Sequence, residues 1–320
     1  MIFTVSSLSF ADSCIKNRGA FDMGSGNTKF KLAKVNICQK KVISILMKKT
    51  IPLPYMDHAR KNNMKIPDGI FQKGIVTVGQ ILKEARKYGI SEIQGVATAA
   101  FRAAKNGPEL IEAIRKKYNF PLRIIEQNTE GLLGYLGAIA YSPKTKVVLD
   151  IGGGSLQFTG FHGSEFKMSG CRCGAIEFKN YVVRNLFKDQ KRLSPNPIGT
   201  NQLDNLLLLA RQFFKERKLP LTPKWWQAQN ATGIGGVLSG GLPHYIKGPI
   251  NSQKLRTALE DMINQTDEEI GGPYAQTTVT NFALAYGILQ TLNLESITPL
   301  RINLTDALLF VSLSELNKSQ

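Results

Sequence analysis

The chain has 320 residues, 42 % of them hydrophobic and 20 % charged, with a formal net charge of +17. This length allows two domains of ordinary size, and the composition is that of a soluble globular protein. The positive charge favours polyanionic partners, such as nucleic acid, an anionic membrane or phosphate-rich small molecules. No apolar run approaches the roughly 18 residues of a membrane span. RNA-binding aromatic patterns and zinc-finger spacings are missing as well, so we expect neither a membrane nor a specific nucleic acid as partner.

The cysteine pattern bears on the compartment. The four cysteines are Cys14, Cys38, Cys171 and Cys173, and only the last two are close together. No second pair and no nearby histidine accompanies them, so the pattern does not favour a metal site. Such usage is typical of a reducing cytosol, and the first residues form no convincing secretion signal. We therefore expect a cytoplasmic protein.

The first half of the chain predicts an α/β domain. Residues 1–18 are expected to be an N-terminal extension. Hydrophobic alternation then predicts three successive antiparallel strands, at 19–23, 29–35 and 41–53. A helix is predicted from Thr77, as its N-cap, to just before Gly89. The remaining elements are a strand at 93–98, a helix capped by Asn106, a strand at 122–126 and a helix at 129–140. The predicted order is βββαβαβα.

The second half begins the same order again. Strands are predicted at 146–153, 155–161 and 165–170, and helices at 175–187, 202–215 and 279–294, with a strand at 225–236 that runs into a glycine turn. A unit repeated at this length indicates a duplicated domain rather than a solenoid. The polar stretch 141–146 contains a proline and is the expected boundary. This gives a first domain at 19–141 and a second at 142–320.

Two strand-turn-strand units contain the candidate residues for binding phosphate and a metal. Asp22 precedes a Gly-Ser-Gly turn, and Asp150 precedes a Gly-Gly-Gly-Ser turn at the matching place in the second half. Glycine lets the backbone approach an anion closely, so the amides of both turns suit one phosphate chain in a cleft between the domains. A carboxylate does not itself bind phosphate. The expected role of Asp22 and Asp150 is to hold a divalent cation against the phosphate oxygens.

Six segments, taken together, resemble one protein family. They are FDMGSGNTKFKL, GVATAAFRAAKNG, IIEQNTEGLLGYLGA, VVLDIGGGSLQF, GCRCGAIEF and ATGIGGVL. In this order they are similar to the exopolyphosphatase and guanosine pentaphosphate phosphohydrolase (Ppx/GppA) family, within the actin, sugar-kinase and Hsp70 superfamily. The chain resembles the short, two-domain members. The second and third segments are specific to the family, whereas the aspartate-glycine turns occur across the superfamily.

The resemblance implies two ribonuclease-H-like (actin-like ATPase) domains around a substrate cleft. It also implies hydrolysis of the terminal phosphoanhydride of polyphosphate or of pppGpp with magnesium, or with manganese in its place. By the same resemblance, Glu130 orients or deprotonates the attacking water and Arg102 lies near the scissile phosphate. Asp22, Asp150 and Gln157 are the implied metal residues. The implied substrate-binding residues are Gly24, Ser25, Gly152, Gly153, Gly154, Ser155, Gly233, Gly235 and Gly236.

Some features leave alternatives open. Family members commonly carry carboxylates at the positions of Gln157 and Thr129, so we expect weaker magnesium binding or an altered metal preference here. The missing carboxylates leave a non-catalytic binder of polyphosphate or guanosine nucleotides open. A kinase or ATPase of the same superfamily stays open as well, because two phosphate loops and an aspartate would also serve ATP. The sequence does not separate polyphosphate from pppGpp. The apolar stretch 282–292 would suit either a homodimer contact or the core of the second domain.

Overall fold

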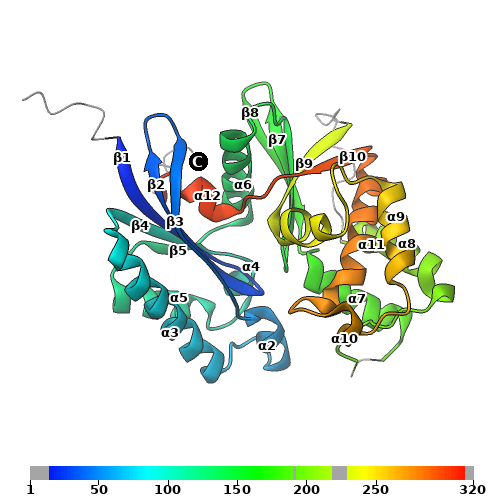
Figure 1. Ribbon diagram of the computed structural model, residues 1–320. Coiled ribbons are helices and arrows are strands. Elements are labelled where there is room, and N and C mark those ends of the chain that lie inside the picture. Colours follow the sequence, from blue (N-terminus) through cyan, green and yellow to red (C-terminus); the bar gives the residue numbers. More distant parts are fainter. Residues whose placement is uncertain (1–13, 190–191, 218–228, 314–320) are drawn as a thin grey trace, which may run out of the picture.

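The computed structural model describes residues 14–189, 192–217 and 229–313. Its first half is built on a mixed five-stranded sheet with the order β3-β2-β1-β4-β5 (Figure 1). Short turns join the three strands that pair antiparallel, which are β1 (Ile15–Met23), β2 (Asn27–Asn36) and β3 (Lys41–Pro52). Helical crossovers bring β4 (Glu92–Ala97) and β5 (Leu122–Ile124) in parallel to β1. The predicted antiparallel strands are confirmed.

Strand alternation gives this sheet two apolar faces. Phe21 and Phe30 belong to a core with α3 and α5, whereas Ala20 and Ala33 belong to a second core with α6 and α12. The helices of this half are α2 (Tyr55–Lys61), α3 (Asp68–Ala85), the 3₁₀ turn η1 (Arg86–Tyr88), α4 (Ala99–Ala103), α5 (Gly107–Tyr118) and α6 (Gln127–Tyr141). Because Leu133 packs with the first sheet and Tyr135 and Ala138 pack with the second, α6 lies between the two sheets.

The second half repeats the topology. Its sheet has the order β10-β9-β6-β7-β8, so each strand takes the place of its counterpart in the first sheet. The strands are β6 (Val147–Ile151), β7 (Leu156–His162), β8 (Glu165–Cys171), β9 (Asn230–Ile234) and β10 (Ser296–Pro299). The first three pair antiparallel, and β9 is parallel to both β6 and β10. The predicted duplication is therefore visible in the strand order.

The helices of the second half enclose the larger core. They are α7 (Ala175–Leu186), α8 (Leu203–Glu216), α9 (Ser252–Met262), α10 (Asp267–Ile270) and α11 (Ala275–Leu292), with short turns η2 (Thr200–Gln202), η3 (Gly236–Gly241) and η4 (Leu242–His244). The apolar residues of α11, from Phe282 to Leu292, are buried in that core. Core packing thus accounts for the apolar stretch, and the homodimer stays a prediction.

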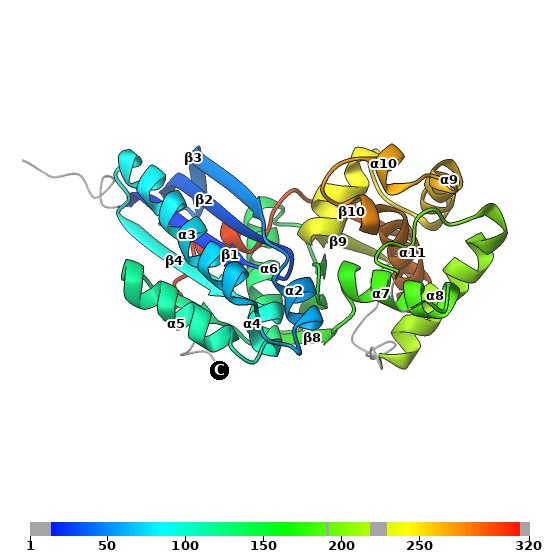
Figure 2. The same cartoon turned by 90° about the horizontal axis from the view of Figure 1, so that it is seen from below.

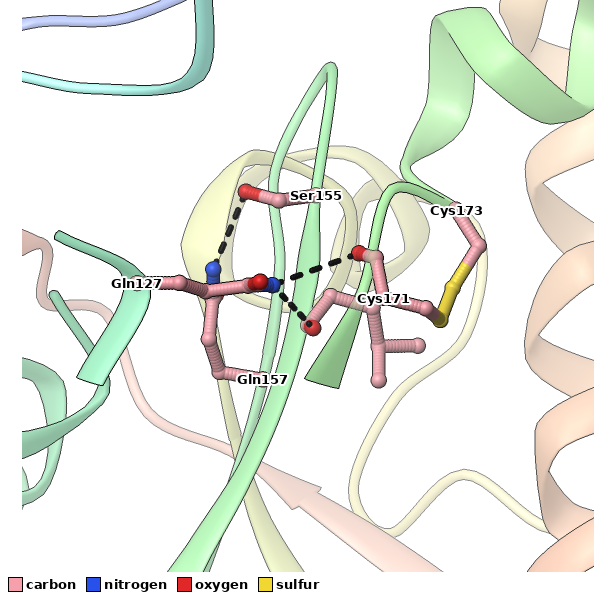
Figure 3. Close-up of a disulfide and its surroundings, with 6 residues drawn as sticks. Gln127, Ser155, Gln157, Cys171 and Cys173 are labelled. Atoms are coloured by element: carbon pink, nitrogen blue, oxygen red, sulfur yellow. Dashed lines mark hydrogen bonds between the residues drawn. A yellow bond between two sulfur atoms is a disulfide. The ribbon is translucent and has the colours of Figure 1, made fainter. Parts of the chain in front are cut away.

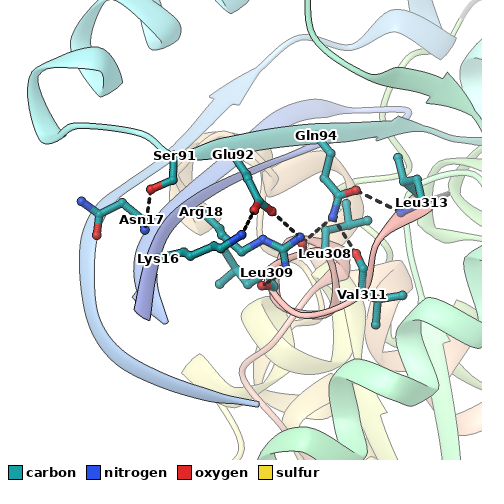
Figure 4. A network of polar contacts seen from close by, with 10 residues as sticks. All are labelled: Lys16, Asn17, Arg18, Ser91, Glu92, Gln94, Leu308, Leu309, Val311 and Leu313. Carbon is teal, nitrogen blue, oxygen red and sulfur yellow. Dashed lines mark hydrogen bonds and ion pairs between the residues drawn. The ribbon is translucent and has the colours of Figure 1, made fainter. Parts of the chain in front are cut away.

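The last described segment returns to the first sheet. Helix α12 (Leu304–Leu308) packs against α6 and β1, and a buried ion pair joins Asp306 to Lys31 of β2. Gln94 of β4 donates from Nε2 to the carbonyls of Leu308, at 2.7 Å, and Val311, at 2.6 Å (Figure 4). Residues 304–313 therefore pack on the first sheet, although the predicted boundary places them in the second half.

Several predicted boundaries differ from the structure. Helix α3 begins at Asp68 rather than after Thr77, and Thr77 is buried within it. Asn106 stands at the N-cap of α5, but its side chain bonds both backbone groups of Ile66 instead of the helix. Strand β1 begins at Ile15, within the predicted extension. Strand β9 begins at Asn230, and residues 225–228 of its predicted range lie outside the described residues.

All four cysteines are paired, as Cys14–Cys38 and Cys171–Cys173. The cysteine spacing alone did not predict this pairing. Within the described ranges, no helix has both the length and the apolar character needed to cross a membrane.

Candidate active site

The first aspartate-glycine turn lies where β1 ends. Asp22 is buried, and it lies directly opposite Lys29 of β2 in the strand register. The Lys29 ammonium is 3.2 Å from Asp22 Oδ2. Burial alone would lower the pKa of Lys29, but Asp22 and Asp150 raise it above its ordinary value. Lys29 is therefore a positive charge that pairs with Asp22 and also interacts electrostatically with Asp150.

The second turn repeats this layout with a different partner. Asp150 ends β6 and lies opposite Gln157 of β7. Its buried carboxylate has no hydrogen bond or ion pair with any residue in the described part of the chain. Burial, then the charges of Glu130 and Asp22, raise the pKa of Asp150 to about 7, while Lys29 opposes them. This carboxylate is poised to accept a cation.

The loops of the two halves touch. A Cβ atom added to Gly154 would lie only 2.6 Å from Ser25 Oγ of the first turn. Gly235, with φ +82°, passes so close to Asp150 that an added Cβ would lie 2.1 Å from Oδ1. The amides of Gly24 and Gly152 donate to Asn27 O at 2.9 Å and to Ser155 O at 3.0 Å, so they close their own turns. The glycines thus allow three loops to converge on Asp150 and Ser25.

Glu130 and Arg102 form an ion pair beside these loops. Glu130 stands in the first turn of α6, and its Oε2 is 2.8 Å from Arg102 Nη2 at the end of α4. Arg102 also donates to the carbonyl of Ile125, which holds the guanidinium in place. Burial raises the pKa of Glu130; the Arg102 charge opposes this and Asp22 adds to it. The carboxylate of Glu130 is thus buried and held against the Arg102 guanidinium.

Side chains of the second half support Glu130 from its other side. Ser155 Oγ donates to Glu130 Oε1 at 3.4 Å. Gln157 Nε2 donates to Ser155 Oγ at 3.0 Å (Figure 3). Gln127, also on α6, donates to the carbonyls of Leu156, at 3.3 Å, and Cys171, at 3.4 Å. These bonds attach the first turn of α6 to the edge of the second sheet. Gln157 acts in this arrangement as a support for the Ser155 hydroxyl.

The structure thus brings together most residues that the sequence predicts for the site. Gly233 has a different position: it lies in β9, where an added Cβ would meet Ile297 Cγ2 at 2.4 Å, so it is needed for packing. An added Cβ at Gly236 would meet no atom within 4 Å. Lys29 is not among the predicted residues, although it follows Asp22 by the same seven positions that separate Gln157 from Asp150. That spacing is the signal that would have found it.

The carboxylates fit a metal that arrives with phosphate better than a metal held by protein alone. No group of three or more metal-binding side chains occurs in the parts of the chain described here. Lys29 and Arg102 neutralise Asp22 and Glu130, which leaves the unpaired Asp150 with Asp22 beside it. Mg²⁺ usually takes one or two carboxylates together with substrate phosphates. Asp150 and Asp22 match that requirement.

Comparisons with known proteins agree with this arrangement. A sequence profile of the Ppx/GppA phosphatase family matches residues 35–194, which is half of the chain. Exopolyphosphatase 1 of Mycobacterium leprae is 30 % identical over 107 residues, which cover 32 % of this chain and 32 % of that protein. The alignment therefore spans about a third of that relative's length.

Solved structures establish the fold. The chain is similar to the Aquifex aeolicus member of the Ppx/GppA family with a TM-score of 0.71 and 17 % identity, over 96 % of this chain and 99 % of that one. An exopolyphosphatase from Cytophaga hutchinsonii gives a TM-score of 0.71 and 16 % identity, over 95 % and 98 % of the two chains. Both likenesses confirm the expected α/β architecture, a two-domain actin-like fold. Phosphatases of this family generally depend on a metal. With its profile match and its duplicated sheets, the chain belongs to the Ppx/GppA phosphatase family.

Proposed function

We propose that the protein is a phosphoanhydride hydrolase, which releases the terminal phosphate of inorganic polyphosphate or of pppGpp. The observation that carries this proposal is the Glu130–Arg102 pair, buried where the loops of both halves meet. Phosphoryl transfer to water needs a positioned water molecule and charge neutralisation more than it needs a covalent intermediate. One carboxylate and one guanidinium at the same point supply both.

The pair also suggests how the substrate starts the reaction. A terminal phosphate that approaches the loops would compete with Glu130 for the Arg102 guanidinium, because both are bidentate acceptors of the same donors. Once Arg102 binds the phosphate, Glu130 Oε2 is free to accept a hydrogen bond from the attacking water. Burial raises the pKa of Glu130, which makes it a stronger general base near neutral pH. Ser155 continues to hold Oε1.

The remaining groups neutralise and orient the phosphate chain. In this proposal the Lys29 ammonium, which pairs with Asp22, contacts phosphate oxygens together with the backbone N–H groups of Ser25, Gly153 and Gly154. A magnesium or manganese ion, when bound, would supply further charge neutralisation, and Asp150 and Asp22 would hold it. Gln157 contributes by supporting Ser155.

A second candidate is a binder of polyphosphate or guanosine nucleotides without hydrolysis. The observation in its favour is that Lys29 and Arg102 already neutralise two of the three carboxylates. The cytoplasm is the location that we propose for either function. Alkylation of protein inside growing cells, followed by mass spectrometry, tests the location, since a reducing compartment would leave Cys14 and Cys38 largely as thiols.

The test is phosphate release from medium-chain polyphosphate and from pppGpp, measured side by side with magnesium, with manganese and with a chelator. The proposal predicts metal-dependent release from at least one substrate without any acceptor molecule. Transfer of phosphate to an added acceptor, in place of its release as free phosphate, would indicate a kinase. Tight binding of either compound without release would contradict hydrolysis and select the binder.

A further inference from the structure

The N-terminus of α7 lies against the two proposed phosphate loops, which are the glycine turns at residues 24–26 and 152–155. The amides of Ala175 and Ile176 donate to the carbonyls of Gly152, at 2.9 Å, and Gly153, at 2.8 Å. The Ile176 side chain reaches the first turn too, because an added Cβ at Gly26 would lie 3.9 Å from its Cδ1. The first turn of α7, at the positive end of a 12-residue helix, therefore borders these loops.

Lys179 stands on the same face of α7, one turn further along. It follows Ala175 by four residues and Ile176 by three, and residues at these spacings are neighbours on a helix surface. Long side chains in helices lean back toward the N-terminus, and the charged groups that act on the Lys179 ammonium are Asp57, Arg60 and Lys61 of α2 together with Asp267. The side chain is only 6 % exposed, yet it has no hydrogen bond or ion pair with any described residue. A buried ammonium without an anion is costly unless something else supplies one.

Helix α2 of the first half faces this position and is also basic. Arg60 of α2 forms an ion pair with Glu177 of α7, which joins the two halves where the helices approach each other (Figure 2). Arg172 lies 3.9 Å from the same carboxylate. Glu177 is thus shared between two guanidinium groups and is not paired with Lys179.

The other charges near Lys179 do not balance it. Burial lowers the pKa of Lys179, Asp57 and Asp267 oppose this, and Lys61 and Arg60 add to it. Asp267 already accepts hydrogen bonds from Ser194 Oγ and Asn196 Nδ2, both at 2.8 Å. Positive charge is therefore in excess between α2 and α7.

We propose that Lys179, together with Arg60 and Lys61, forms a second phosphate subsite, which takes a phosphate group of an inorganic polyphosphate chain beyond the bond that is cleaved. The proposal rests on the proposed function for the identity of the anion. The phosphate replaces Glu177 as the partner of Arg60 and supplies the anion that Lys179 lacks. The phosphates of a guanosine nucleotide present the same oxygens, so the test compares both compounds.

The experiment measures binding in a Glu130→Gln background, in which turnover is expected to be slow. Dissociation constants for tripolyphosphate, medium-chain polyphosphate and pppGpp are determined by calorimetry at one salt concentration. Lys179→Met removes the charge and keeps an apolar stem, and we expect it to weaken polyphosphate binding roughly tenfold. Lys179→Arg restores most of the affinity. Lys215→Met, on the exposed end of α8, is the matched control and leaves the affinity unchanged.

Three outcomes overturn the proposal. A folded Lys179→Met variant with unchanged affinity for polyphosphate would show that the lysine is only a buried structural residue. Weakening for pppGpp alone would assign the subsite to nucleotide phosphates. If Lys179→Met does not fold, the Arg60→Gln/Lys61→Met variant tests the subsite from α2, and unchanged affinity there contradicts it. Phosphate release by the wild type is a separate readout, so loss of the proposed hydrolase activity is distinguishable from loss of the subsite.

Discussion

The ion pair between Arg102 and Glu130 illustrates how single residues set the chemistry of this site. Both side chains are largely buried, at 19 % and 9 % exposure. A buried pair adds little net stability, because desolvation of the two charges offsets their attraction, but removal of one partner leaves an unpaired charge. The pair is therefore more informative about function than about folding.

Replacing Arg102 by methionine tests how much stability is lost when one partner of the pair is removed. The change leaves Glu130 buried without its cation, so we expect a loss of about 3 kcal/mol in unfolding free energy at pH 8. Chemical denaturation measures it. The Arg102→Met/Glu130→Gln double variant should recover most of the loss, and Arg115→Met, on an exposed arginine, should change little. Full stability of the single variant at pH 8 would argue against a buried ionised pair.

Asp150 should make stability depend on pH in metal-free protein. Its pKa rises from 3.8 to about 7 on folding, with burial as the main cause. The folded state thus binds the proton more tightly than the unfolded state does. The contribution of this proton to folding stability is therefore full below about pH 4 and is lost as the pH rises through 7. At pH 8 the Asp150→Asn variant should be more stable than wild type by roughly 4 kcal/mol, and this advantage should vanish near pH 4. Denaturation in the presence of a chelator measures it, with the exposed Asp261→Asn as control; equal stability at pH 8 would contradict the assignment.

At the scale of elements, the turn from β8 to α7 supports the second phosphate loop. Gly174 precedes α7, and an added Cβ would lie 2.5 Å from Gly152 O and 2.6 Å from the carbonyl carbon of Gly153. These are backbone atoms, so the loop itself would have to move.

We therefore expect Gly174→Ala to cost about 1–3 kcal/mol of stability and to lower phosphate release by roughly tenfold or more. Gly69→Ala in α3 is the control, because its Cβ would meet no atom within 4 Å and alanine favours a helix. Thermal melting and steady-state rates report both effects. A Gly174→Ala variant with wild-type rates would mean that the loop position does not matter for turnover.

Strand alternation and helical periodicity predict most elements, because both patterns are local. The strands around Asp22 and Asp150 follow from alternation alone, and their equivalence follows from the repeat. The start of α3 is missed because Gly69 and Gly74 lower the helix propensity of residues 68–76, although Phe71 and Ile75 already stand at helical spacing. Lys29 and Lys179 are missed for another reason: their partners, or the lack of them, depend on strand register and on how α2 meets α7.

At the scale of the whole molecule, the chain crosses between its two halves twice. Helix α6 lies between the sheets, and residues 304–313 return from β10 to the first sheet. The sequence does not predict the return, since five-residue helices such as α12 carry almost no periodic signal. The buried Lys31–Asp306 ion pair holds α12 against the first sheet.

Breaking the Lys31–Asp306 ion pair should lower the stability of the first half of the chain. Asp306→Asn leaves Lys31 buried without its carboxylate. We expect the free energy of unfolding to fall by about 3 kcal/mol and hydrogen exchange in β1 and β2 to become faster. Asp204→Asn on the exposed side of α8 is the control. Unchanged exchange in β1 would contradict a stabilising role of the returning segment.

We propose that Glu130 activates the attacking water where the phosphate loops of the two halves meet. The most direct measurement is phosphate release from polyphosphate by wild type, by Glu130→Gln and by Glu126→Gln, which removes an exposed charge from the N-cap of the same helix. We expect Glu130→Gln to lower the rate by at least roughly 100-fold with an unchanged circular dichroism spectrum, while Glu126→Gln stays near wild type. Equal rates for Glu130→Gln and wild type would contradict it.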